Sequence, residues 1–293
     1  MAYHCYMKIA LFLALVVLFP ARLLLADPAE ESPSSPTQFA SSPLDLRVAP
    51  PYVLFEDGVR ATEISLINSS NHKLTYALSF KRMRMLEDGD IVSIHEPRPG
   101  EQFADEMVRF TPRRVVLLPR QIQTVRLRAM RPATLQDGEY RSFLNFAVVP
   151  NAQEALPVDE KQPTTGLKIN LTPVYGVAIP VVVRKGKLDL AVRLVGLKVV
   201  EDAKRGQLLS MTIERDGKRS SAGILEVERD VPGTKRVQVA RVAGVSVMAP
   251  LAKRNILMQL RHPEGIRLGH GTLKVRYLDS VDRHVLAEGQ LIL

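Results

Sequence analysis

A chain of 293 residues with 46% hydrophobic residues can bury a core, and its length favours about two domains. Only 5% of the residues are aromatic and none is Trp, so Val, Leu and Ile must supply most of the core, which suits strands better than long helices. Basic residues outnumber acidic ones by 40 to 31, but no run of basic residues is interleaved with aromatics, which argues against nucleic-acid binding.

The first 26 residues have the pattern of an export signal. Lys8 precedes an apolar run that begins at Ile9 and ends at Pro20, and the small Ala26 precedes an acidic stretch. We therefore predict that residues 1–26 form a signal peptide that is cleaved after Ala26. A membrane anchor is the alternative, although the apolar run is shorter than the roughly 20 residues that a spanning helix needs.

The mature chain is predicted to have a leader and no disulfide. The single cysteine, Cys5, precedes the apolar run, so core packing alone must hold the exported fold together. Residues 27–43 are rich in Pro, Ser and acidic side chains and offer little to bury, which predicts a flexible leader.

Short apolar stretches alternate with turn residues from Leu44 onward, and no helical period persists for more than two turns. Polar turn clusters, Pro or the pair Asp137-Gly138 separate the stretches. Strands bounded by turn residues at such spacing are typical of a β-sandwich or a barrel. In the first half of the chain the predicted strands are residues 62–67, 74–80, 115–119, 124–129 and 140–149.

The segment 167–183 has the longest strand pattern. Nine successive odd-numbered positions in it are apolar, which predicts one extended strand. Pro173 and Pro180 have no N–H to donate, so the strand is expected at a sheet edge over part of its length. A long apolar edge strand is a liability for a soluble protein unless it has a partner, and the alternative is a strand bent at Gly176 with its apolar face buried internally.

A polar hinge at residues 184–187 is predicted to separate this strand from a second all-β region. The pair Asp216-Gly217 predicts a hairpin in that region. The fold class is thus all-β, with two immunoglobulin-like β-sandwich domains in tandem, at residues 44–185 and 186–293. Seven strands are predicted in the second domain, at residues 188–194, 208–214, 224–227, 237–247, 255–260, 272–277 and 284–293.

A series of short motifs runs through residues 46 to 184. In chain order they are Val53-Leu54-Phe55, Ile64-Ser65-Leu66-Ile67-Asn68, Thr111-Pro112, Leu118-Pro119, Thr124-Val125-Arg126-Leu127, Gly138-Glu139-Tyr140-Arg141-Ser142-Phe143-Leu144-Asn145 and Val149-Pro150. In order and spacing they resemble the first domain of the PapD-like family, the periplasmic chaperones of chaperone-usher pili. The second half shows an all-β pattern without matching motifs.

The resemblance implies a periplasmic chaperone whose two immunoglobulin-like domains meet at a cleft. It implies pilus or fimbrial subunits as partners and an outer-membrane usher as a further one, and we also expect self-association through the edge strand. In this family the long strand of the first domain lends apolar side chains to an incomplete subunit, which is donor-strand complementation. The segment 167–183 matches that strand, and the subunit-binding residues so implied are Leu167, Ile169, Leu171, Tyr175, Val177 and Ile179.

The sequence departs from the family at the cleft. The family holds the subunit's terminal carboxylate with an Arg and a Lys, but Tyr52 and Pro180 stand at those positions here. Neither supplies a fixed positive charge, so Lys168, Arg184 or Lys185 would have to act as substitute anchors. The alternative is a non-catalytic structural or adhesion-type protein with two immunoglobulin-like domains that has lost subunit anchoring.

Catalytic residues, cofactors and metal sites are not predicted. The five histidines after residue 26 lie far apart in the sequence, and no Gly-x-Ser-x-Gly motif occurs, so we do not expect an enzyme. Arginines alternate on or beside the predicted strands, which indicates a solvent-facing sheet face; the alternative is a basic surface that meets an acidic subunit, an usher or a membrane. These arginines are Arg82, Arg84, Arg113, Arg114, Arg126 and Arg128.

Overall fold

The structure is a computed structural model that describes residues 45–149, 175–261 and 268–293. The predicted signal peptide and leader therefore lie outside the described residues. So does the first part of the predicted long strand, with Leu167, Ile169 and Leu171. The described residues contain β-strands and no α-helix, which confirms the all-β prediction. None of them forms a helix that could span a membrane.

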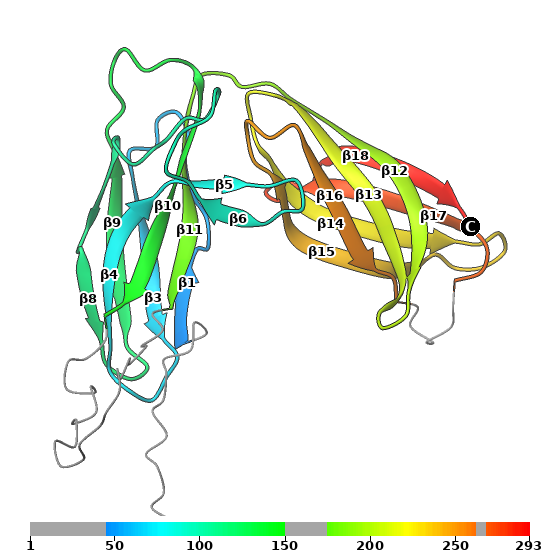
Figure 1. Ribbon diagram of the computed structural model, residues 1–293, viewed down its shortest axis with the longest axis horizontal. Helices are drawn as coiled ribbons and strands as arrows, with labels where there is room; N and C mark the ends of the chain where they lie inside the picture. Colours follow the sequence, from blue (N-terminus) through cyan, green and yellow to red (C-terminus); the bar gives the residue numbers. More distant parts are fainter. Residues whose placement is uncertain (1–44, 150–174, 262–267) are drawn as a thin grey trace, which may run out of the picture. The chain divides into compact units, whose positions relative to one another are not determined.

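Strands β1 to β11 form a two-sheet sandwich and a short hairpin (Figure 1). One sheet has the order β1 (Leu46–Ala49), β3 (Ala61–Asn68), β9 (Ile122–Ala129) and β7 (Val108–Thr111). The other has the order β2 (Val53–Phe55), β11 (Gly176–Lys185), β10 (Gly138–Val148), β4 (Leu74–Lys81) and β8 (Arg114–Leu117). The hairpin pairs β5 (Met83–Met85) with β6 (Ile91–Ser93).

The core between these two sheets follows from alternating side chains. In β9, Val125 and Leu127 are buried whereas Arg126 and Arg128 are exposed, because successive residues of a strand point to opposite faces. Two polar residues also fix this sandwich. The buried Asn68 donates through Nδ2 to the carbonyl oxygen of Leu118 at 3.0 Å, and Tyr140 Oη donates to that of Gln136 at 3.0 Å, as in the tyrosine corner of immunoglobulin-like domains.

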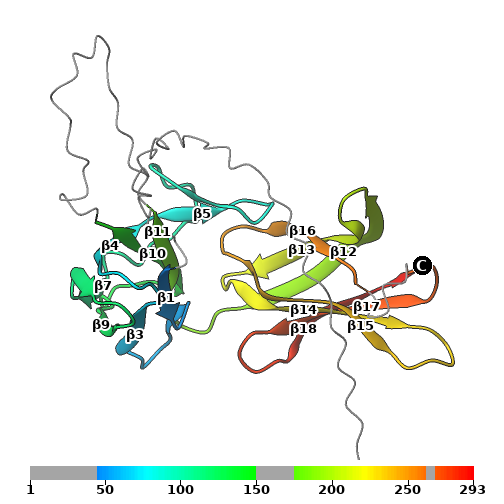
Figure 2. The ribbon, with the colours of Figure 1, turned by 90° about the horizontal axis from the view of Figure 1, so that it is seen from below.

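Strands β12 to β18 form a second two-sheet sandwich with its own core (Figure 2). Each of the seven strands predicted in this half has a counterpart. One sheet has the order β12 (Leu190–Asp202), β13 (Gly206–Gly217) and β16 (Lys253–Gln259). The other has the order β15 (Val237–Val247), β14 (Ser221–Asp230), β17 (Thr272–Asp279) and β18 (Val285–Ile292).

The hairpin predicted at Asp216-Gly217 is wrong. Strand β13 pairs with β12 and β16, while β14 belongs to the other sheet, so the chain crosses between sheets after Gly217. The glycine is needed for a different reason. Its φ is +99°, and a Cβ atom there would lie 2.4 Å from the carbonyl oxygen of Asp189.

The polar hinge predicted at residues 184–187 begins too early. Strand β11 continues through Lys185, and Arg184 is buried, with 9% of its surface exposed. The next residue, Gly186, lies outside the strand and has a φ of +76°. A charged residue is rarely buried without a partner, and the partner of Arg184, Glu139, lies 45 residues away in the sequence.

Candidate functional site

Strand β11 is an edge strand over only part of its length. It pairs antiparallel with β10 from Gly176 to Lys185, but β2 covers its other side only at Val181–Val183, in parallel. From Gly176 to Pro180 no described strand pairs with that side. The prediction that the strand lies at a sheet edge over part of its length is thus confirmed for β11: the described edge runs from Gly176 to Pro180, and β2 covers Val181–Val183.

The main chain of β11 presents hydrogen-bonding groups to this open edge. Tyr175 lies opposite Val148 of β10, and the Val148 N–H donates to the Tyr175 carbonyl oxygen at 3.1 Å. In an antiparallel pair, residues bonded to one neighbour alternate with residues whose groups point the other way. The N–H and C=O of Gly176 and Ala178 therefore point to the open side, and Pro180 has the same phase but no N–H.

The odd-numbered side chains of β11 form one apolar face, which is buried in the core of the first sandwich at one end of the strand and exposed at the other. Val183 and Val181 are fully buried and Ile179 is 4% exposed, while Val177 is partly buried against the same core. Tyr175 follows at 41% exposed. The odd-numbered side chains thus change from core to surface within one strand, although all point to the same face.

The predicted subunit-binding residues therefore differ in whether they are buried in the chain's own core. Ile179 packs inside the chain's own sandwich, whereas Tyr175 and Val177 have surface available for a partner. The three remaining predicted residues lie outside the described residues, and in the sequence they continue the same alternation. The interpretation of a strand whose apolar face is buried internally therefore applies to the end of β11. The interpretation of an open edge strand applies to its beginning.

The two positions at which the resemblance led us to expect basic residues are Pro180, on this strand, and Tyr52, directly before β2. Pro180 is partly buried on β11. Tyr52, which precedes β2, keeps 37% of its surface exposed, yet loss of hydration, with a contribution from Glu139, raises the pKa of its hydroxyl to about 12. The Tyr52 hydroxyl is therefore neutral at physiological pH.

The substitute anchors that are described make contacts within the chain. Arg184 donates from Nε to Glu139 Oε2 at 3.0 Å and from Nη1 to Glu56 Oε1 at 3.1 Å. Lys185 Nζ donates to the carbonyl oxygen of Leu135. Lys168 lies outside the described residues.

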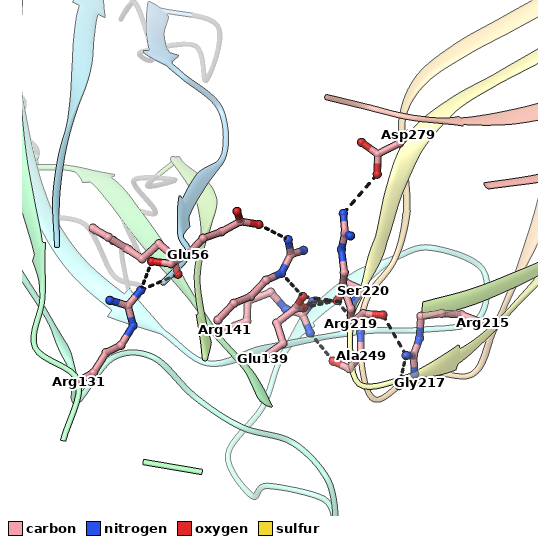
Figure 3. Close-up of polar contacts among 12 residues, drawn as sticks. Glu56, Arg131, Glu139, Arg141, Arg215, Gly217, Arg219, Ser220, Ala249 and Asp279 are labelled. Carbon is pink, nitrogen blue, oxygen red and sulfur yellow. Dashed lines mark hydrogen bonds and ion pairs between the residues drawn. The ribbon is translucent and has the colours of Figure 1, made fainter. Parts of the chain in front are cut away.

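Glu139 lies at the centre of a buried polar cluster (Figure 3). Its carboxylate accepts hydrogen bonds from Arg184, from the Ser220 N–H at 3.1 Å and from the Ser220 hydroxyl, and Arg141 Nη1 lies 3.6 Å away. Arg141 also donates to Ser220 Oγ at 3.1 Å and to the carbonyl oxygen of Ala249.

The balance of charge in this cluster keeps Glu139 ionised. Burial disfavours the carboxylate, but Arg141, Ser220 and Arg184 together lower the pKa of Glu139 below its ordinary value. The folded state therefore favours the ionised form of Glu139, and the polar groups of the cluster are occupied by one another. Sequence analysis recorded Glu139 and Arg141 only as parts of a motif, because Ser220 is 81 residues away from Glu139.

Three residues of types that bind metals also meet around the turn between β17 and β18. Asp279, Asp282 and His284 each have a ligand atom within 4.8 Å of the others. Asp279 Oδ2 accepts from Arg219 at 3.3 Å, and its Oδ1 accepts from the Val281 N–H at 2.8 Å. Hydrogen bonds of the turn account for this grouping without an ion.

Solved structures with a similar fold include chaperones. They include the YadV chaperone (14% identity, TM-score 0.41, 85% of this chain and 100% of that chain covered) and the Pseudomonas aeruginosa CupB2 chaperone (14%, 0.39, 84% and 98%). Another is the CsuC–CsuE chaperone and tip-adhesion-subunit complex from archaic chaperone-usher Csu pili of Acinetobacter baumannii (13%, 0.41, 84% and 97%).

These structural similarities concern only the general fold. No protein-family model matches the sequence, and no curated protein matches it. Because the identities are low and the TM-scores are below 0.5, the matches carry no functional argument, and the function depends on the geometry of β11.

Proposed function

We propose that this protein is a periplasmic chaperone that binds pilus or fimbrial subunits by donor-strand complementation through β11. The observation that supports it is the apolar face that passes from the buried Val181 to the exposed Tyr175 beside an open sheet edge. A subunit whose sandwich lacks a strand could pair its own edge with Gly176 and Ala178. Main-chain hydrogen bonds would then supply affinity, and pockets for alternate side chains would supply specificity.

The apolar side chains could supply enough free energy for stable capture. Each fully buried Leu, Ile or similar side chain contributes roughly 1.5–3 kcal/mol. If Tyr175 and the predicted residues Leu167, Ile169 and Leu171 all enter a subunit, they supply about 6–12 kcal/mol. That sum is comparable with the cost of association, so main-chain pairing would be needed as well.

We assign subunit binding to the strand rather than to Arg184 and Lys185, because both of these have partners within the chain. Lys168 stays a candidate anchor. The proposal involves no catalytic step and no cofactor, and export to the periplasm follows from the signal peptide predicted at residues 1–26.

The test is periplasmic co-expression of the chain with pilin-like subunits encoded beside it. We expect wild type to co-purify with a subunit, and the variant Leu171→Asp/Tyr175→Asp to recover at least about tenfold less, because a buried unpaired carboxylate opposes insertion. The matched control is Val281→Asp/Ile292→Asp, which places the same two charges at apolar residues that are 83% and 82% exposed and should leave the yield unchanged.

Equal subunit yield from the double variant and wild type would contradict the proposal. That result would favour the structural or adhesion-type alternative, which makes the apolar face of β11 irrelevant to subunits. Circular dichroism of each purified variant checks that a lower yield does not result from unfolding.

A further inference from the structure

The outer face of the β1-β3-β9-β7 sheet carries arginines. Arg126 and Arg128 of β9 and Arg109 of β7 are exposed, and Arg47 of β1 is exposed on the same sheet. We refer to Arg109, Arg126 and Arg128 as the arginine face. It belongs to the sheet opposite the one that contains β11, so a partner there would not compete with strand capture.

The strand register places like charges together on this face. Arg109 is the direct antiparallel partner of Arg128, and such partners have their side chains on the same side, with Cβ atoms about 5 Å apart. Arg126 is two residues from Arg128 and therefore shares the face. Like charges in direct opposition destabilise a sheet, so the arrangement does not serve folding.

Little negative charge offsets these cations within the described part of the chain. Arg126 Nε donates to Glu63 Oε1 at 2.8 Å. Arg109 donates from Nη1 to the main-chain oxygen of Glu106 at 3.1 Å, and Arg128 has no ion pair among the described residues. Three guanidinium groups therefore share one carboxylate.

Two of the other arginines that the sequence grouped with these have carboxylate partners. Arg82 pairs with Asp105 at 2.9 Å, and Arg84 pairs with Glu101. The alternating arginines that the sequence grouped together therefore do not form one surface. Arg126 and Arg128 belong to β9, whereas Arg82 and Arg84 are held by carboxylates elsewhere in the sandwich.

A comparable sheet face in the second sandwich is neutralised. There Lys274 pairs with Asp230 at 2.7 Å, and Arg276 pairs with Glu228 at 3.0 Å. This chain thus pairs both of these cations in one exposed sheet face and leaves the three guanidinium groups of the arginine face with the single carboxylate of Glu63. The difference leaves the arginine face with positive charge that an anionic ligand could neutralise.

Side-chain chemistry narrows the class of that ligand. The guanidinium fork matches planar oxyanions such as carboxylates, and the strands place small or polar residues, including Ser65, Thr111 and Thr124, around it. These four strands carry no Lys, and their one aromatic residue, Phe110, packs against the core. Surfaces that bind anionic membranes combine basic residues with a band of exposed aromatic or Leu side chains. Here Ile122, at the start of β9, is the one large apolar side chain of these four strands that is exposed, at 60%, which favours a protein ligand.

We propose that the arginine face is a docking surface for an acidic segment of a second protein, whose Asp and Glu carboxylates take the place of the missing partners of Arg109 and Arg128. The inference is independent of the proposed function, because it concerns a different sheet and different residues.

The test is binding of a fluorescent oligoglutamate peptide to the full chain, measured by anisotropy at low and at physiological salt. We expect the variant Arg109→Gln/Arg128→Gln to bind at least about tenfold more weakly, because charge-assisted hydrogen bonds are lost. The control Arg113→Gln/Arg114→Gln removes the same charge from exposed residues at the start of β8 and should bind like wild type.

Two further measurements complete the test. The variant Arg109→Lys/Arg128→Lys keeps the charge but loses the fork, and we expect severalfold weaker binding. Equal weakening by the two Gln variants would overturn the proposal, since net charge would then explain it. So would failure of wild type to bind oligoglutamate, or binding confined to phosphatidylglycerol vesicles.

Discussion

The buried residues Glu139, Arg141 and Arg184 depend on one another to remain charged. Removing one member of a buried ion pair leaves an uncompensated charge and costs about 3–5 kcal/mol. Ser220 supplies two further donors to Glu139, so the carboxylate is satisfied from both halves of the chain. The motif could be read from the sequence but its role could not, because the burial of Glu139 depends on distant residues.

Glu139→Gln is expected to lower the free energy of unfolding by about 3 kcal/mol at pH 7, since it removes the charge that compensates Arg141 and Arg184. The folded chain lowers the pKa of Glu139, so its contribution is present above the unfolded value of about 4.5 and is lost as the pH falls towards the folded value. Urea unfolding at several pH values measures both effects.

The difference between wild type and Glu139→Gln should therefore narrow below about pH 4.5. A difference in unfolding free energy that is the same at pH 7 and at pH 3.5 would mean that the ionised carboxylate does not stabilise the fold.

At the scale of the element, β11 combines a core strand with an exposed one. The period of two and the missing N–H of Pro180 predicted its alternation and its partial edge position. The pairing of Val181–Val183 with β2 was not predictable, because three residues before the first long strand give no signal for a parallel partner far along the chain. A local pattern shows which face is apolar, but not where the covering sheet ends.

Ile179→Ala and Tyr175→Ala should separate these two parts of β11. Ile179 is 4% exposed, so its truncation should cost roughly 2–5 kcal/mol of unfolding free energy. Tyr175 is 41% exposed, and its truncation should cost less than about 1 kcal/mol while reducing subunit capture. Urea denaturation of the two purified variants gives the comparison.

Equal destabilisation by the two substitutions would place Tyr175 in the core and remove its role as a partner-binding residue. A large effect of Tyr175→Ala on subunit yield with little effect on stability is the result that the proposed function requires.

At the scale of the molecule, two sandwiches with separate cores account for the described chain. Alternation and turn residues predicted the strands of the second half, because each buries one face. Sheet order was harder to predict, as Asp216-Gly217 shows: a turn dipeptide permits a hairpin, but close approach to Asp189 also requires glycine. Resemblance to a chaperone family supplied the functional hypothesis, and β11 supplied its physical basis.

Amide hydrogen exchange, resolved by residue, tests the central claim most directly. In the free chain the N–H groups of Gly176 and Ala178 should exchange quickly, while those of Val177 and Ile179, which face β10, should be protected. With a subunit bound, Gly176 and Ala178 should become protected as well. Unchanged fast exchange at both residues in a stable complex would contradict strand pairing at this edge.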